Sequence, residues 1–133
     1  MTLQLSASVR NARLDAVETV IGTAPLLCLY TGTMPASTVT TYTGSVVAEF
    51  ALPSDWLVTA ATGTKVKAGT WSGTSSASGI VGYFRIKDTG GIVHLQGVCT
   101  VTGGGGDMTL DSLSVTSGQP VTVATFTLNE SNA

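Results

Sequence analysis

The sequence predicts an all-β fold, a β-sandwich with jelly-roll character, with one short N-terminal helix or arm. Three observations lead to this fold class. The chain of 133 residues holds 22 threonines, whose branched side chains suit pleated strands. Most of the chain beyond residue 23 alternates apolar and polar residues, and Gly, Pro, Asp or Ser clusters interrupt it at short intervals. The length suits one domain, so we expect an arm or helix over 1–22 and a single β-sandwich over 23–133.

Residues 6–21 are the one stretch with helical periodicity. The apolar residues that share one stripe at three- and four-residue spacing are Val9, Ala12, Ala16 and Val20, with Val17 and Ile21 beside it. Ser6 or Ser8 is expected to cap the start, and Gly22 to end the helix. The charges oppose the helix dipole, because Arg10 and Arg13 lie near its positive end and Glu18 near its negative end. We therefore expect the helix to need a docking surface, on its own domain or on a neighbour.

The first half of the remaining chain is expected to contain three main strands. The predicted segments are a strand over 26–30, a threonine-rich loop over 31–44 with an edge strand at 39–42, a strand over 46–52, a turn with a short helical start at 53–56, a strand over 65–71, and a flexible Gly/Ser loop over 72–79. Pro53 ends the second strand, because proline cannot donate to a strand ladder.

The second half is expected to contain four segments of alternation. These are strands over 80–87 and 93–101 joined by a hairpin turn at 88–91, a strand over 108–115, and a last strand after a turn at 117–120. In the last strand, Val121 and Val123 are out of phase with Phe126 and Leu128. A bulge near Ala124 is predicted to restore one buried face, because a one-residue slip turns every later side chain over.

Composition excludes several classes of function. Only 11% of the residues are charged, and the net charge of −2 argues against a phosphate-binding surface and therefore against nucleic acid. No apolar run approaches the roughly 20 residues of a membrane span. The first residues lack a basic segment and an apolar core, so we expect no signal peptide. Low charge with abundant threonine and glycine fits an all-β protein that hides surface against neighbours.

Few residues are suited to catalysis or to binding a metal. His94 is the only histidine, which rules out a site of several histidines, and we expect it at the surface or in an interface. No Gly-X-Ser-X-Gly motif is present. Asp107 and Asp111 offer too few oxygen ligands to indicate calcium. We therefore expect no enzyme activity, no catalytic or metal-binding residue, no cofactor and no small-molecule substrate.

The two cysteines leave three alternatives open. Cys28 and Cys99 both fall in predicted strands. They are either buried free thiols, which a bacterial cytoplasm would keep reduced, or a structural disulfide, or an intermolecular bridge. We favour the free thiols.

The glycine run 103–106 and the aromatic residues also have two interpretations each. The run lacks the Lys-Ser/Thr of a phosphate loop, so it is a mobile hairpin tip, or a place where another backbone comes close. Trp71, beside the Gly/Ser loop, is the best aromatic candidate for a contact or for stacking on a sugar. The alternative is a core residue.

Several segments together resemble a family of small virion structural proteins of tailed bacteriophages. In chain order they are 5–16 (LSASVRNARLDA), 18, 21–23, 52–56 (LPSDW), 69–71 (GTW), 84–86 (FRI) and 102–109 (TGGGGDMT). The resemblance covers nearly the whole chain, and the glycine block with Asp107-Met108 is its most specific part. It implies a non-enzymatic protein of the virion.

With the composition, this resemblance leads us to expect a capsid cement or decoration protein on the phage head, assembled in the bacterial cytoplasm. Its expected partners are the major capsid protein and further copies of itself, in a homodimer by default or in another homo-oligomer. The alternatives are a tail- or fibre-associated protein, or a glycan-binding module on the virion. The expected contact residues are Leu3, Leu5, Val9, Arg10 and Arg13 in the N-terminal segment, Met34 and Tyr42 in the loop 31–44, and Trp71, Gly104 and Gly105. The three segments are chosen because each looks hard to hold in place without a partner.

Overall fold

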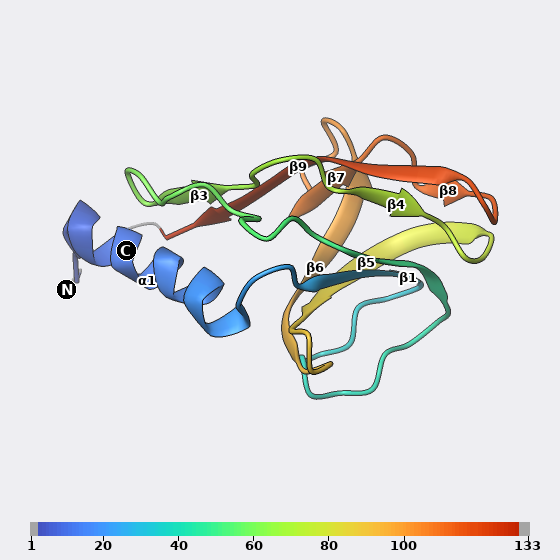
Figure 1. Cartoon of the computed structure of the whole chain (residues 1–133), viewed down its shortest axis with the longest axis horizontal. Coiled ribbons are helices and arrows are strands. Elements are labelled where there is room, and N and C mark those ends of the chain that lie inside the picture. The colour runs from blue at the N-terminus through green and yellow to red at the C-terminus, as the bar shows by residue number, and fades with distance from the viewer. Residues whose placement is uncertain (1–2, 131–133) are drawn as a thin grey trace.

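A computed structural model describes residues 3–130, so the first two residues of the expected arm and the last three of the expected domain lie outside the described part. Helix α1 (Ala7–Ile21) lies at one end of the molecule (Figure 1). The strands are β1 (Leu26–Thr31), β2 (Val46–Ala51), β3 (Thr64–Val66), β4 (Ser72–Thr74), β5 (Gly79–Lys87), β6 (Val93–Val101), β7 (Met108–Leu110), β8 (Ser114–Val115) and β9 (Pro120–Asn129).

The strands form one large mixed sheet in the order β2-β1-β5-β6-β7-β9-β3, with β4 paired to β9 and β8 paired to β5. Every pair is antiparallel except β6 with β7. Strand β6 joins two parts of this sheet, the part with β2, β1 and β5 and the part with β7, β9 and β3. Its residues 93–98 pair with β5, and its residues 99–101 pair with β7. Figure 1 shows β4 and β9 lying across from β1 and β5. Over residues 3–130, the chain is therefore mostly β with one helix, as the sequence predicts.

The main core contains residues from both parts of the sheet. Leu27 and Leu29 enter it from β1, and Val123 and Phe126 enter it from β9. Trp71 lies in the middle, with its ring centroid 5.2 Å from that of Phe126. Both parts therefore depend on the same buried cluster.

Helix α1 docks on its own domain, with its apolar stripe turned outward. Ser6 caps the start by accepting a hydrogen bond from the Val9 amide, and Gly22 caps the end. The buried residues of the helix are Leu14 and Ile21. The stripe that marks the helix in the sequence is thus not its buried face.

The bulge predicted in the last strand is present. Thr109 pairs with Thr125, and the next residue, Leu110, pairs with Val123, so Ala124 is the extra residue on β9. Val123 and Phe126 are both buried while Ala124 is exposed. The phase change in the sequence is therefore resolved as expected, by one unpaired residue.

Two predictions for the first half are wrong. Residues 53–56 have no helical start. The Trp56 side chain is instead buried, and its Nε1 donates to the Gly22 carbonyl at 3.0 Å. Residues 72–79 are not simply a flexible loop, because 72–74 form β4. A Cβ atom on Gly73 would lie 2.4 Å from the Phe50 ring, so the glycine lets Phe50 pack against this strand.

Two further segments differ from their predictions. Residues 39–42 form no strand, and the predicted strand over 108–115 is divided into β7 and β8. Asp111 lies at this division, where its Oδ1 accepts a hydrogen bond from the Ser112 amide at 3.0 Å. A side chain that bonds to a neighbouring backbone group competes with the strand ladder.

Candidate interaction surfaces

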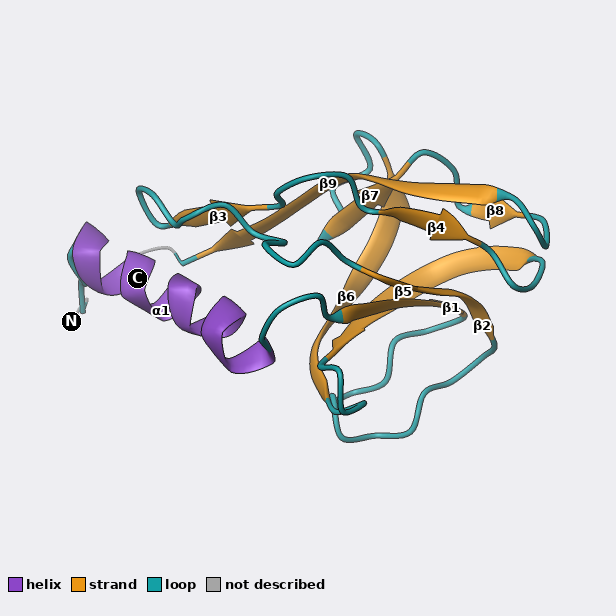
Figure 2. Ribbon diagram, in the orientation of Figure 1, coloured by secondary structure: helices purple, strands orange, loops and turns teal. Residues whose placement is uncertain are grey.

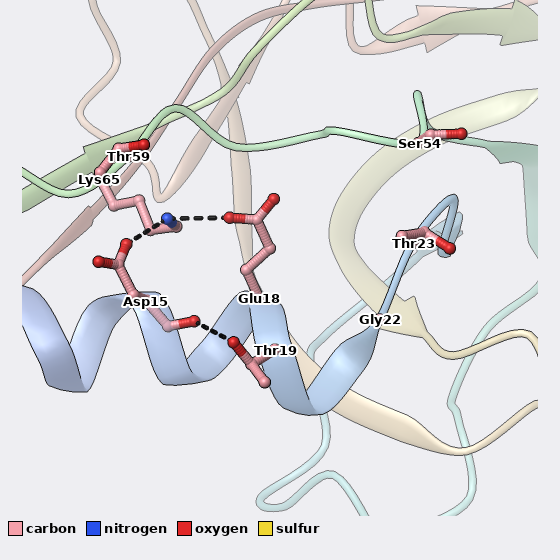
Figure 3. A pocket seen from close by; sticks show the side chains of 8 residues that line it. All are labelled: Asp15, Glu18, Thr19, Gly22, Thr23, Ser54, Thr59 and Lys65. Atoms are coloured by element: carbon pink, nitrogen blue, oxygen red, sulfur yellow. Dashed lines mark hydrogen bonds and ion pairs between the residues drawn. The ribbon is translucent and has the colours of Figure 1, made fainter.

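The inner side of α1 is fixed to the sheet by a buried ammonium group. Lys65 lies on β3, and only 1% of its side chain is exposed. Its Nζ lies 2.6 Å from Asp15 Oδ1 and 2.9 Å from Glu18 Oε2, on neighbouring turns of the helix (Figure 3). In the alternation of β3, Lys65 therefore points inward and Val66 outward. The two carboxylates compensate the charge, which makes burial of the lysine acceptable.

These contacts shift the pKa values of Asp15 and of Lys65. Hydrogen bonds from Lys65 and from the Ala60 amide lower the pKa of Asp15. Burial by itself lowers the pKa of Lys65, but the hydrogen bonds to Asp15 and Glu18 outweigh it, and the pKa is raised. Asp15 and Lys65 are thus both charged at neutral pH. A cavity of about 390 Å³ opens beside them, partly lined by hydroxyl groups.

The N-terminal half of α1 is held by the segment before β3 and by the end of β9. Asn11 Oδ1 accepts a hydrogen bond from the Gly63 amide at 2.9 Å. Arg13 forms an ion pair with the Glu130 carboxylate at 2.7 Å, and Arg10 donates to the Glu130 carbonyl at 3.2 Å. Gly63 has φ +73°, and a Cβ there would lie 2.4 Å from Arg10 Nη1. The docking of α1 is therefore largely polar.

The outer face of α1 is by contrast apolar apart from one arginine. It is formed by Val9, Ala12, Arg13, Ala16 and Val20. The exposed fraction is 46% for Val9 and 68% for Val20, and the alanines between them are exposed as well. A surface helix usually turns its apolar stripe toward the core. Here the arrangement is reversed, which is typical of a helix that contacts another protein.

A groove of about 320 Å³ runs beside this face. Its lining residues are Arg13, Ala16, Val17, Val20, Ile21 and His94. His94 comes from β6, and its Nε2 lies 2.9 Å from Asp88 Oδ2. The hydrogen bond from His94 lowers the pKa of Asp88. His94 is thus half-buried at the rim of a surface groove.

The β1–β2 loop (residues 32–45, teal in Figure 2) is held by a buried arginine. Arg85 on β5 is 3% exposed and donates to the Thr40 carbonyl at 2.7 Å and the Ser37 carbonyl at 3.4 Å. Its Nε donates to Gln96 Oε1 at 3.1 Å, and Gln96 in turn donates to the Pro35 carbonyl at 2.8 Å. Within residues 3–130, no ion pair joins Arg85 to a carboxylate.

An aromatic cluster fixes the rest of this loop. The Tyr83 hydroxyl donates to the Thr43 carbonyl at 2.8 Å and accepts from the Thr43 amide at 2.9 Å. Tyr30 stacks on Tyr83 with ring centroids 4.9 Å apart, and Tyr42 packs on Tyr30 at 5.0 Å. Met34 is packed against the same cluster. The expectation that this loop is hard to hold without a partner is therefore wrong.

The surface of the β1–β2 loop is uncharged, because the sequence has no charged residue from 31 to 48. Val39 is 92% exposed and Tyr42 is 47% exposed. Sequence reasoning missed Val39, which it placed in an edge strand. It also missed Arg85, although the alternation of Tyr83 and Arg85 opposite Phe84 indicates that β5 has a second face.

The glycine run makes a short connection between parallel strands. Residues 102–107 link β6 to β7, whereas parallel neighbours usually need a dozen or more connecting residues. Cβ atoms on Gly104 and Gly106 would lie 2.7 and 2.8 Å from the Thr100 side chain, and the Gly106 amide donates to Thr100 Oγ1 at 3.0 Å. The run is therefore not a hairpin tip, and its glycines make room for the Thr100 side chain of the same chain.

The structure divides the predicted contact residues among four places. Leu3, Leu5, Val9, Arg10 and Arg13 lie in or before α1; Met34 and Tyr42 lie in the β1–β2 loop; Gly104 and Gly105 lie in the β6–β7 connection; and Trp71 lies in the core. Leu3 is 69% exposed, Leu5 and Arg10 are half-buried, and both glycines are exposed.

The prediction of Trp71 as a contact residue is wrong. It has no exposed surface, and its Nε1 donates to the Ala68 carbonyl at 3.0 Å. Its ring packs between those of Trp56 and Phe126, with centroids 5.9 and 5.2 Å away. The alternative of a core residue is the correct one, because a large apolar ring stabilises the fold most when it is buried.

The cysteines are free and lie in different clusters, as we favoured. Cys28 belongs to the small cluster under the β1–β2 loop, and Cys99 belongs to the main core. Burial raises the pKa of Cys28 to about 11 and that of Cys99 to about 12. Both thiols are therefore protonated and unreactive at neutral pH.

Comparisons of the chain with protein-family models, with curated proteins and with solved structures found no match. The resemblance drawn from the sequence segments thus stays a prediction. Within residues 3–130, no three His, Cys, Asp or Glu side chains gather where they would hold a metal ion. The helix found in that range lacks the length and apolar character of a membrane span.

Proposed function

We propose that this chain is a non-enzymatic structural protein of a tailed-phage virion, a cement protein that binds the major capsid protein on the head surface. The observation that carries this proposal is the β1–β2 loop, an uncharged surface that is ordered without a partner. Its most exposed apolar residue is Val39, at 92%. The centre of a protein interface is typically poor in charged residues, as this surface is. The resemblance of the sequence segments supports the same class.

The mechanism is attachment of one rigid surface to many identical sites. Arg85 and Tyr83 fix the loop before binding, so little conformational entropy is lost when it docks. An all-β scaffold with one core keeps the loop in a constant position. We also propose that the two facing halves of the sheet form a β-sandwich. Trp71, the aromatic residue expected to stack on a sugar in a glycan-binding module, is buried and has no exposed surface for such a contact.

Quantitative mass spectrometry of separated heads and tails tests the location. We expect the chain in the head fraction, in a fixed ratio to the major capsid protein. Recovery only in the tail fraction at low copy number would instead identify a tail component.

A substitution tests the surface. We expect Val39→Asp to weaken binding of the purified protein to heads that lack it by about tenfold, because a charge would enter an apolar contact. Val58→Asp, at a valine that is 47% exposed elsewhere, is the matched control and should bind like the wild type. Equal binding of both variants would contradict the assignment of the loop.

A further inference from the structure

The outer face of α1 has a pattern that suits pairing with a second copy of itself. Its exposed apolar residues are Val9, Ala12, Ala16 and Val20, so a large residue stands at each end and two small ones lie between. The order of residue types, valine, alanine, alanine, valine, is the same in both directions, with spacings of three, four and four residues. A two-fold interface requires such self-complementarity, because both copies contribute the same patch.

We propose that α1 packs antiparallel against α1 of a second copy of this chain. Val9 of each copy then lies against Val20 of the other, and Ala12 and Ala16 lie at the crossing. The small alanines let the helix backbones approach closely, while the valines fill the space at both ends. The groove beside Val17 and Val20 receives the N-terminal half of the second helix.

Charge complementarity favours the antiparallel orientation. α1 has no acidic residue in its first turn and no basic residue in its last turn, so its own side chains compensate neither end of the dipole. Antiparallel packing places the positive end of each helix beside the negative end of the other. Arg13 keeps its ion pair with Glu130 of its own copy in this arrangement.

The length of α1 limits the area that the two copies bury, and so the affinity of the dimer. With 15 residues, α1 is about 22 Å long. One face of such a helix buries less than the roughly 800 Å² per partner of a standard interface. We therefore expect a dimer that dissociates in the micromolar range. This inference goes beyond the proposed function and does not depend on it. A dimer would carry two β1–β2 loops, and two linked surfaces bind a lattice more tightly than one.

Sedimentation equilibrium of the purified protein over a wide concentration range tests the dimer. Val20→Asp and Val39→Asp are matched variants, because each places an aspartate at a highly exposed valine, on α1 and in the loop. We expect the wild type and Val39→Asp to reach dimer mass with rising concentration, and Val20→Asp to remain monomeric. Circular dichroism verifies that all three are folded. A wild type that stays monomeric at every concentration, or a Val20→Asp variant that dimerises like Val39→Asp, would overturn the proposal.

Cysteine cross-linking tests the orientation. Single Val9→Cys and Val20→Cys proteins are mixed and mildly oxidised, and the native thiols do not compete because both are buried. Antiparallel packing predicts that the mixed disulfide between the two variants dominates. Predominance of disulfides within each variant would show parallel packing and overturn the orientation.

Discussion

Helix α1 and the β1–β2 loop both cover the same β scaffold, but they are attached by different chemistry. The helix is held by ion pairs, with Lys65 between Asp15 and Glu18. The loop is held by Arg85, whose partners are neutral carbonyl and amide oxygens. The ion pairs depend on the protonation of carboxylates, whereas the neutral acceptors do not titrate. A substitution or a change of pH should therefore loosen the attachment of one surface without loosening that of the other.

The largest effect is expected for Arg85→Met. The substitution leaves the Ser37 and Thr40 carbonyls and the Gln96 amide oxygen without their donor, which should lower the free energy of unfolding by about 3 kcal/mol. Urea unfolding measures this change, and hydrogen exchange should accelerate in the β1–β2 loop but not in α1. Lys87→Met is the control, because the ion pair of Lys87 with Glu49 is loose, at 3.5 Å. Equal stability of the two variants would show that Arg85 does not hold the loop.

A smaller effect is expected for Lys65→Met, because the carboxylates that lose their partner are partly exposed and become hydrated. We expect a loss of about 2 kcal/mol in the free energy of unfolding, with faster hydrogen exchange in α1 and unchanged exchange in the loop. Lys67→Met, two residues along the chain, should cost less than about 1 kcal/mol, since Lys67 donates only to the Gly69 carbonyl. If exchange in the loop rises as much as in α1, the two attachments are not independent.

The smallest effect is expected from acid. The pKa of Asp15 is lowered in the folded protein, so its contribution is present above the unfolded pKa of about 3.9 and is lost as the pH falls through the folded value. The pKa of Lys65 is raised, so its contribution is lost only at alkaline pH, above about 10.4. Between pH 7 and pH 3, exchange protection corrected for intrinsic rates should fall in α1 and persist in the β1–β2 loop. An Asp15→Asn variant should show a smaller fall, and an identical fall would assign the acid sensitivity to another group.

Local patterns predicted much of the scaffold. The bounds of α1, the hairpin between β5 and β6 and the bulge at Ala124 all follow from periodicity and turn residues, which act over a few neighbours. The parallel connection at the glycine run was not predicted, because it depends on how closely the chain passes Thr100. The same applies to Trp71, whose ring is buried against Phe126, which is distant in the sequence.

The interaction surfaces were predicted less well for the same reason. Helical spacing correctly groups Val9, Ala12, Ala16 and Val20, all of which are exposed. The side of α1 that faces the sheet, however, is set by Lys65, about 50 residues away in the chain. The order of the β1–β2 loop is likewise set by Arg85. The pattern of a single sequence shows which residues share a face. It does not show which face packs against a charged residue that is distant in the chain.

Hydrogen exchange of the protein bound to purified phage heads, compared with the free protein, tests most directly whether this chain presents ordered surfaces to capsid protein. We expect added protection at the exposed amides of residues 36–43, with little change in β5 and β9. Identical exchange in the two states at saturating heads, or protection confined to the other side of the scaffold, would contradict it.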